Sequence, residues 1–333
     1  MDRRKALSFL YSVNFGILAG LLLCALPAGA QDKYPSRPIE IVTQYPPGGI
    51  ADTSFRAIEP FLSRRLGVPL VIINKSGAGG SIATDYVKRA RPDGYTILNG
   101  ANTPLTTARA MNPKIDYSIT DFIALGLYSV DPNIVVSSRQ DNRWKDFDGF
   151  IAYAKVHPGE LSYGDGGFGG GGFFTMEIIK QARGLNIQAV HYRGSAVLKT
   201  EILGGHIPLA SGGVGALGPL VAGNQAVGLA TTAKRRLRDL SEVPTLFELE
   251  IPDAAVSPSM ALFAPRNTPP DLVSILSSAL ADVMKQPDAL ASLERSGMIP
   301  EYQDGPTTLR MYEAEYEQSR KIVEKLNLAT DPQ

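Results

Sequence analysis

The chain has 333 residues, of which 44% are hydrophobic and 20% are charged, and it contains 33 basic and 33 acidic residues. A chain with this balance has no strong basic field, which excludes a protein that acts mainly by attracting nucleic acid or an anionic membrane. The length suits two domains of ordinary size. A chain of this size buries a large core without disulfides, and its one cysteine is Cys24.

The first thirty residues have the three parts of a secretory signal peptide. A basic segment at residues 3–5 precedes an apolar run at 15–26, and small residues at 28–30 form a cleavage site. The apolar run is too short for a comfortable membrane span, and Leu23 precedes Cys24 where a lipoprotein signal needs a small residue. We therefore expect export and cleavage after Ala30. The mature chain then has 30 basic and 32 acidic residues, because the leader holds three bases and one acid.

Short apolar runs alternate with amphipathic segments, which is the pattern of an α/β fold with mostly parallel sheets. Strands are expected at residues 39–45, 70–74, 96–100, 122–128, 134–137, 161–163, 187–192, 208–211, 226–231 and 260–264. Helices are expected at 52–66, 81–89, 147–156, 173–183, 196–203, 270–285 and 307–326. In the first of these helices, Pro60 is expected to cause a kink or an early end.

Residues 207–233 carry no charge, so they have to be considered as a membrane span. Pro208, Pro219 and several glycines interrupt the segment, and a basic run follows it. A buried strand, a turn, a helix and a second strand explain the segment better.

A Pro-Pro-Gly-Gly turn between the first strand and the first helix forms a candidate anion-binding loop. Pro47 restricts the backbone after Tyr45, while Gly48 and Gly49 let a ligand approach the main chain closely. The free N–H groups at the start of the following helix suit a carboxylate. Asp52 either caps this helix or belongs to the ligand shell, and the two roles are compatible.

A second glycine-rich loop lies at residues 163–174. Its candidate ligand-binding residues are Asp165, Gly166, Gly167, Phe168, Gly169 and Gly170. The loop contains a formal G-x-G-x-x-G, but it lies in the middle of the chain and no acid follows at 187–191 to bind a ribose. A dinucleotide site is therefore disfavoured.

Further candidates are scattered along the chain. Asn102 and Thr103 follow the strand at 96–100, at a carboxyl end where ligand groups belong. Arg193 offers a guanidinium fork for a second carboxylate, unless it is a surface residue beside a turn.

The histidines give no support for catalysis or for a metal site. His157, His191 and His206 lack metal-ligand spacing, and there is no nucleophile elbow or phosphate-binding P-loop motif. We expect no metal, no organic cofactor and no enzymatic activity. A secreted α/β hydrolase stays the less favoured alternative, because a catalytic triad can assemble from distant residues.

Eight sequence blocks together resemble one known family. They are YPSRPIEIVTQYPPGGIAD from Tyr34, NKSGAGGS from Asn74, RPDGYTIL from Arg91, HPGELSYG from His157, HYRGS from His191, EILGGHIPLA from Glu201, VPTLFELEIP from Val243 and APRNTPPDL from Ala264. In this order they resemble the Bug family, the periplasmic substrate-binding proteins of tripartite tricarboxylate transporters. The resemblance covers essentially the whole mature chain.

The resemblance implies a two-lobed type II periplasmic binding protein fold of the α/β class with a central ligand cleft. Carried over to this chain, lobe 1 is residues 31–131 plus 256–333, and lobe 2 is residues 132–255. The two glycine-containing loops would face each other across the cleft and donate hydrogen bonds to the ligand, directly or through water.

The resemblance also shows where this chain departs from the family pattern. Gly170 stands where relatives have Ser or Thr, Phe173 where they have His, and Ser211 where they often have an acid. The missing side chains leave room, and Phe168 and Phe173 offer an aromatic face. This predicts a bulky, even aromatic, carboxylate as ligand, although Phe173 and Phe174 suit a helix core equally well.

The function that the resemblance implies is capture of an organic carboxylate in the periplasm for the membrane permease subunits of a tripartite tricarboxylate-type transporter. A ligand-binding role in a sensing pathway is the alternative. We expect the protein to act as a monomer.

Overall fold

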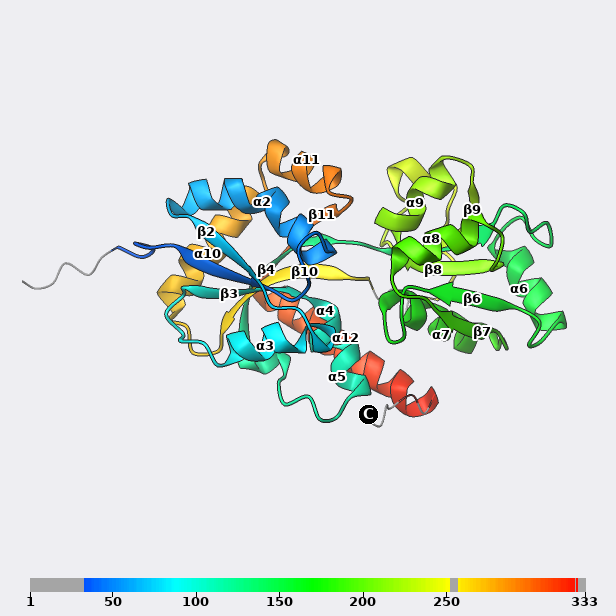
Figure 1. Cartoon of the computed structure of the whole chain (residues 1–333), viewed down its shortest axis with the longest axis horizontal. Coiled ribbons are helices and arrows are strands. Elements are labelled where there is room, and N and C mark those ends of the chain that lie inside the picture. The colour runs from blue at the N-terminus through cyan, green and yellow to red at the C-terminus, as the bar shows by residue number, and fades with distance from the viewer. Residues whose placement is uncertain (1–32, 252–256, 327, 329–333) are drawn as a thin grey trace, which may run out of the picture. The chain divides into compact units, whose positions relative to one another are not determined.

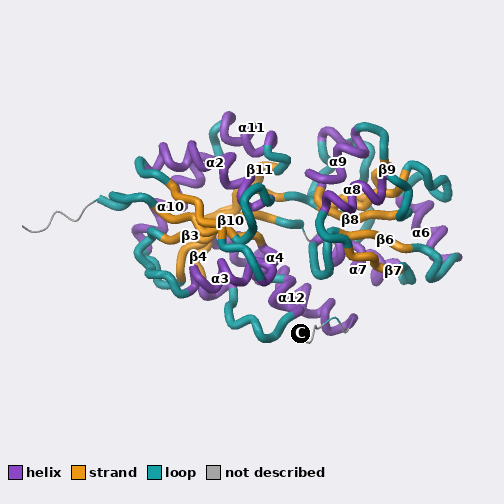
Figure 2. Tube along the Cα trace, viewed as in Figure 1, coloured by secondary structure: helices purple, strands orange, loops and turns teal. Residues whose placement is uncertain are grey.

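Two β-sheets organise this computed structural model, which describes residues 33–251, 257–326 and 328 (Figure 1). Both sheets belong to the segment Arg37–Gln333, which forms one unit by its internal contacts. In each part of this segment the strands lie inside and the helices lie outside (Figure 2). The predicted signal peptide, residues 1–30, lies outside the described residues.

The first sheet has six strands in the order β11-β4-β10-β3-β1-β2. These strands are β1 (Ile39–Thr43), β2 (Leu70–Asn74), β3 (Thr96–Ala101), β4 (Phe122–Val130), β10 (Ser259–Pro265) and β11 (Ile299–Asp304). The accompanying helices are α2 (Ile50–Leu66), α3 (Ser81–Lys88), α4 (Asn102–Leu105), α5 (Thr107–Met111), α10 (Pro270–Val283), α11 (Pro287–Arg295) and α12 (Gly305–Leu326). Short 3-10 turns occupy Ala78–Gly80 and Ile119–Asp121.

Both faces of the first sheet are covered by helices. Ile41 of β1 and Leu62 of α2 line the same small cavity on one face, whereas the neighbouring Val42 packs with Val87 of α3 and Tyr312 of α12 on the other. Consecutive residues of a strand point to opposite faces, so a run of buried residues is what a sheet between two helical layers requires. Figure 1 shows α2 and α11 on one side of this sheet and α3 and α4 on the other.

The second sheet has five strands in the order β7-β6-β8-β5-β9. These strands are β5 (Asn133–Ser138), β6 (Ser162–Asp165), β7 (Gln188–His191), β8 (Leu209–Gly213) and β9 (Ala226–Thr231). Its helices are α6 (Phe147–Val156), α7 (Gly171–Arg183), α8 (Ser195–Leu203) and α9 (Val214–Ala222), and a 3-10 turn follows at Arg238–Leu240. Val135 of β5 packs with Phe174 of α7, and its neighbour Ile134 packs with Leu217 of α9 on the opposite face.

The chain crosses between the sheets directly after β4 and again directly before β10. The two crossing segments lie side by side, because the backbone N–H of Asp131 donates to the carbonyl of Pro258 at 2.8 Å. α12 also reaches both sheets, since Tyr312 belongs to the core of the first and Ile322 and Val323 to the core of the second. The sheets are therefore linked through paired backbone and through a shared helix.

The expectation of mostly parallel sheets is wrong. β10 is antiparallel to β3 and β4, β11 is antiparallel to β4, and β5 is antiparallel to β8 and β9. Parallel pairs link β1 to β2 and β3, and β6 to β7 and β8. The chain enters β5 and β10 from the other sheet and not through a helical crossover within the same sheet. These two strands therefore run antiparallel to their neighbours.

Of the two effects expected of Pro60, a kink or an early end of the helix, the early end does not occur. α2 continues past Pro60 to Leu66, and Pro60 lies on its exposed side. The buried face that contains Phe55, Ile58 and Leu62 holds the helix against the core. The sequence analysis also missed α4, α5, α11 and β11.

The uncharged segment at 207–233 forms β8, α9 and β9, as expected. Within the described residues, no helix combines the length and the apolar character that a membrane span needs.

Gly172 tests the contact between α7 and β8. A Cβ at Gly172 would lie 2.2 Å from the backbone carbonyl oxygen of Ser211. We expect Gly172→Ala to lower the free energy of unfolding by about 1–3 kcal/mol in urea denaturation, because backbone cannot move aside as a side chain can. At Gly166 the nearest atom to an added Cβ is 3.6 Å away. Gly166→Ala is the matched control and should change stability little; equal losses in both variants would contradict the interpretation.

Candidate ligand-binding site

A cavity of about 880 Å³ brings together seven of the residues predicted to bind ligand. Its wall is formed by elements of the first sheet and by the loop between β6 and α7 of the second. The predicted residues in the wall are Tyr45, Thr103, Gly166, Gly167, Phe168, Gly169 and Gly170. The other lining residues are Ala78, Gly79, Ser81, Asp85, Ala108, Met111, Asn112, Lys114, Ile115, Asp116 and Tyr117. The volume is typical of a site for a small molecule.

A buried carboxylate holds the loop after β6. The backbone N–H of Gly167 donates to Oδ1 of Asp165 at 2.7 Å, and Nδ1 of His191 lies 2.9 Å from Oδ2. Asp165 is fully buried and does not line the cavity. Burial raises the pKa of Asp165, while the hydrogen bonds from Gly167 and His191 oppose the rise. The side chain of Asp165 thus supports the loop, and the backbone of the loop faces the cavity.

The loop approaches α5 so closely that one position requires glycine. Gly169 has φ +75°, and a Cβ there would lie 2.6 Å from Sδ of Met111. A side chain at this position would be strained in its backbone and would also press against Met111. Gly167, at φ +141°, likewise adopts a conformation that favours glycine. The glycines therefore bring the main chain close to the opposite wall of the cavity.

The start of α7 supplies hydrogen-bond donors beside this loop. Gly170 is the N-cap of α7 and provides no side-chain cap. The N–H groups of the first helical turn, residues 171–173, have no acceptor within the helix and carry its partial positive charge. An anion in the cavity next to Gly170 is the kind of partner that such groups attract.

One of the two predicted aromatic side chains lines the cavity. Phe168 is 45% exposed, and its ring centroid lies 5.0 Å from that of Phe173 and 5.2 Å from that of His191. Phe173 and Phe174 are buried in the core of the second sheet. The aromatic face of the cavity therefore comes from Phe168. Phe173 does not add to it, because its side chain belongs to the core.

Two phenols form part of the wall from the first sheet. Burial raises the pKa of Tyr45 to about 12, and the nearby Tyr117 adds to the rise. The hydroxyl of Tyr117 lies 2.8 Å from Oγ of Ser81 and donates to the carbonyl of Pro104 at 3.1 Å. Both phenols therefore stay neutral at ordinary pH and act as hydrogen-bonding groups.

The first predicted loop contributes Tyr45 to the cavity but not its glycines. Pro47, Gly48, Gly49 and Asp52 are absent from the wall. The buried carboxylate of Asp52 accepts hydrogen bonds from Gly48 N at 2.9 Å, from Nε of Arg56 at 2.8 Å and from Nδ2 of Asn74 at 3.1 Å. Asp52 thus fixes the shape of the turn before α2.

Asn102 and Thr103 are neighbours with different surroundings. Thr103 lines the cavity. Nδ2 of Asn102 donates to both oxygens of Glu315, at 2.7 and 2.9 Å, and to the carbonyl of Ser257 at 3.0 Å. The carboxamide of Asn102 is therefore used in hydrogen bonds to the crossing segment and to α12.

Ser211 and Arg193 also lie outside the wall of the cavity. The hydroxyl of Ser211 is buried and has no hydrogen-bond partner among the described residues. Arg193 is exposed. Neither residue is brought to the cavity in the way that the sequence analysis expected.

Three charged side chains line the cavity. Asp85 pairs with Arg89 at 3.0 Å, and Oδ1 of Asp116 lies 3.6 Å from Nζ of Lys88, an ammonium that Asp116 shares with Asp121. Lys114 is exposed and forms no ion pair with any residue that the structure describes. Lys114 is therefore the cationic side chain of the wall, and no carboxylate that the structure describes compensates its ammonium.

The sequence analysis missed the wall formed by Gly79, Ser81 and residues 108–117. The only available signal was the block NKSGAGGS, a glycine-rich turn just before a helix. Within the described ranges, no group of three or more His, Cys, Asp and Glu side chains is placed to hold a metal ion.

The sequence is similar to that of known receptors. The sequence profile of the tripartite tricarboxylate transporter family receptor matches residues 54–328. A Cupriavidus necator protein described as "UPF0065 protein in gbd 5'region" is 34% identical over 93% of this chain and 94% of its own length. Protein BugT of Bordetella pertussis is 28% identical over 86% of this chain and 87% of its own length.

Solved structures show the same fold. A TctC solute-binding protein from Polaromonas superposes with a TM-score of 0.79 at 27% identity, over 88% of this chain and 99% of its own. An R. palustris protein solved with adipate superposes with a TM-score of 0.74 at 29% identity, over 87% of this chain and 97% of its own. MatC from Rhodopseudomonas palustris with bound malate superposes with a TM-score of 0.71 at 26% identity, over 87% of this chain and 100% of its own.

Asp52 offers a test of how the first loop is held. Burial alone would raise the pKa of Asp52, but hydrogen bonds from Arg56, Gly48 and Asn74 outweigh it and keep the pKa below its usual value. The stabilisation is therefore complete above the unfolded-state pKa and is lost as the pH falls through the lower folded-state pKa. We expect Asp52→Asn to cost about 1–3 kcal/mol at pH 7 in urea denaturation, with a smaller difference from wild type near pH 3.

The matched control for this test is Asp148→Asn, which changes an exposed acid in the first turn of α6. It should alter the unfolding free energy by less than about 0.5 kcal/mol. A loss in Asp52→Asn that does not depend on pH would contradict the role of the ionised carboxylate.

Proposed function

The chain belongs to the tripartite tricarboxylate transporter family of receptors, and on that premise we propose that it captures an organic carboxylate for uptake. Proteins of this family are periplasmic solute-binding receptors and not enzymes. The predicted Bug family membership, two-lobed fold and absence of enzymatic activity are confirmed by the family match and the related structures. The hydrolase alternative is thereby excluded.

One combination of groups carries the proposal for a carboxylate ligand. The loop of Gly166 to Gly170 presents its backbone to the cavity, α7 begins beside it, and the ammonium of Lys114 is uncompensated. Backbone N–H groups and an ammonium are donors without acceptor capacity, and they bind anions through charge-assisted hydrogen bonds. The neutral phenol of Tyr45 can donate to the same anion, whereas the single proton of Tyr117 is already donated to the carbonyl of Pro104.

We assign direct or water-bridged ligand contacts to Tyr45, Thr103, the loop of Gly166 to Gly170, and Lys114. Asp52 and Asp165 act by holding the two loops in shape. We assign to Lys114 the role of the cation that binds a carboxylate, which the sequence analysis assigned to Arg193, because Lys114 lines the cavity and Arg193 does not.

The two predicted lobes explain how ligand binding would favour closure of the protein around the ligand. Lobe 1 is residues 31–131 plus 256–333, and lobe 2 is residues 132–255. A carboxylate that contacts Lys114 in one lobe and the loop of Gly166 to Gly170 in the other gains its full set of contacts only when both lobes surround it. Such a ligand shifts the population toward the closed form by the free energy of those additional contacts.

The chemistry of the cavity favours an acid larger than a short aliphatic diacid. The R. palustris relatives were solved with adipate and with malate. In this chain Gly170 provides no side-chain cap at the start of α7, and the half-exposed ring of Phe168 lines the cavity. An aromatic or otherwise bulky carboxylate would contact this ring.

We further propose that the protein works in the periplasm as a monomer after removal of residues 1–30, and that it presents its ligand to permease subunits. Deletion of its gene should then abolish uptake of the radiolabelled ligand. A role in sensing would leave uptake intact and remove a transcriptional response instead.

Binding screens test the ligand class directly. We expect an aromatic carboxylate to raise the melting temperature of the mature protein more than adipate, malate or citrate does. A ligand at 100 times its dissociation constant adds about 2.7 kcal/mol to the free energy of unfolding, which is readily visible. A screen in which malate or citrate gave the largest shift would refute the aromatic preference, and a screen without any carboxylate hit on refolded protein would refute the proposed function.

Two substitutions then locate the binding site. Lys114→Gln should raise the Kd for the carboxylate by about tenfold, as the loss of one charge-assisted hydrogen bond predicts. Phe168→Ala should raise the Kd by about threefold to tenfold for aromatic acids only. Isothermal titration calorimetry measures both. Lys145→Gln and Phe61→Ala are the controls, because neither residue lines the cavity, and equal effects in the controls would place the ligand elsewhere.

A further inference from the structure

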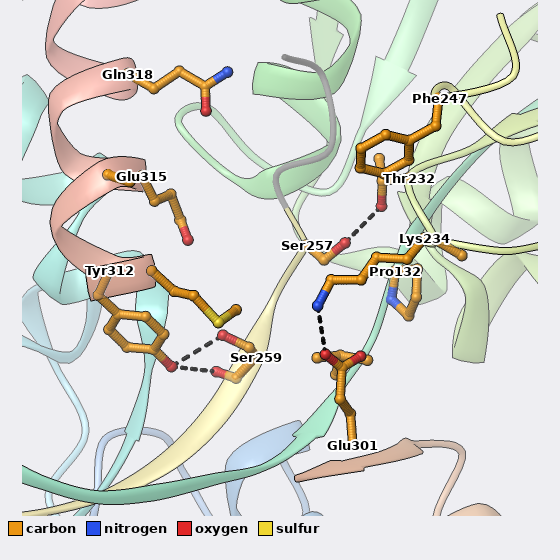
Figure 3. Close-up of a pocket in the computed structure, with 14 residues that line it drawn as sticks. Pro132, Thr232, Lys234, Phe247, Ser257, Ser259, Glu301, Tyr312, Glu315 and Gln318 are labelled. Carbon is orange, nitrogen blue, oxygen red and sulfur yellow. Dashed lines mark hydrogen bonds and ion pairs between the residues drawn. The ribbon is translucent and has the colours of Figure 1, made fainter. Parts of the chain in front are cut away.

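A second cavity, of about 280 Å³, lies where the chain passes between the two sheets (Figure 3). The crossing segments contribute Pro132 and Ser257 to its wall, and the chain after β9 contributes Lys234 and Phe247. Glu315 of α12 forms part of the opposite side and points into the cavity (Figure 3). The residues that line this cavity are all different from those that line the larger one.

The carboxylate of Glu315 is held in place by neutral donors. Oε1 accepts from Nδ2 of Asn102 at 2.7 Å and from Oγ1 of Thr106 at 2.8 Å, and Oε2 accepts from Nδ2 of Asn102 at 2.9 Å. These bonds fix the orientation of the carboxylate. They bring no positive charge, and they leave Oε2 with acceptor capacity.

The charges of the cavity do not balance. Nζ of Lys234 pairs with Oε1 of Glu301 at 2.7 Å, so this ammonium is already neutralised. Glu315 forms no ion pair with any residue in the described part of the chain. Burial raises the pKa of Glu315 to about 7, while the bonds from Asn102 and Thr106 oppose the rise. A buried carboxylate without a cationic partner gains free energy when a cation reaches it.

The rest of the wall suits the apolar part of a small molecule. Val130 and Met311 contribute aliphatic surface, and Phe247 presents a ring that is 43% exposed. An aromatic face attracts an ammonium group as well as alkyl carbons. The cavity thus combines one uncompensated carboxylate, an aromatic ring and aliphatic side chains in a space of small-molecule size.

We propose that this cavity is a second binding site and that it takes a small organic cation, a primary alkylammonium of a few carbon atoms. The ammonium group binds Oε2 of Glu315, and the alkyl chain lies against Phe247 and the aliphatic wall. The larger cavity has an uncompensated ammonium, so the two sites select ligands of opposite charge. The proposal does not depend on which carboxylate the larger cavity binds.

The test uses n-butylammonium chloride with the mature protein. We expect a saturable rise in the melting temperature that n-butanol and sodium chloride at the same concentrations do not produce. n-Butanol matches the alkyl chain without the charge, and sodium chloride matches the ionic strength without the alkyl chain. A rise of equal size with either of them, or no saturable rise at all, would overturn the proposal.

Two variants locate the cation. Glu315→Gln should weaken n-butylammonium binding at least tenfold, whereas Glu313→Gln, which changes an exposed acid on the same helix, should leave it unchanged. Phe247→Leu should weaken binding about threefold; because Phe247 is exposed, this variant stays informative even if Glu315→Gln folds poorly. Binding that persists at full strength in Phe247→Leu and in folded Glu315→Gln would overturn the assignment of the site.

Discussion

The carboxamide of Asn102 joins parts of the chain that lie far apart in the sequence. Its nitrogen donates to the carbonyl of Ser257 and to the carboxylate of Glu315, and its oxygen accepts from the backbone N–H of Ser259 at 3.1 Å. The end of β3, the returning segment before β10 and helix α12 are thereby fixed to one another. The next residue, Thr103, already lines the larger cavity. The geometry of the junction and the geometry of the larger cavity thus depend on the same short helix, α4.

The larger cavity relies on main-chain groups more than on charged side chains. Backbone N–H groups can donate to any carboxylate, so under the proposed function they would set the class of ligand but not its identity. Under the same proposal, selection within that class would fall to the side chains that define the shape of the cavity, above all Phe168 and Met111. Related structures with this fold were solved with acids as different as adipate and malate.

The sequence predicted most strands and the position of the second glycine-rich loop, because both have strong local signals. Glycine-rich turns and short apolar runs of β-branched residues need no tertiary information to be recognised. β11 was missed because Ile299–Asp304 is half-buried at an edge of the sheet and shows no clear alternation. The direction of β10 depends on a crossing between sheets, and the wall at residues 108–117 depends on packing against a distant loop. Neither the direction of β10 nor the position of this wall can be recognised from the local sequence.

Helix α12 makes the two sheets dependent on the last part of the chain. Tyr312 completes the first core, and Ile322 and Val323 complete the second. A polypeptide that emerges from the ribosome therefore cannot finish either core until its C-terminal residues are available. A fragment that ends before Gly305 would contain every strand of both sheets and still expose apolar surface on both. Both cores should consequently be completed late in folding, once α12 can pack against the two sheets.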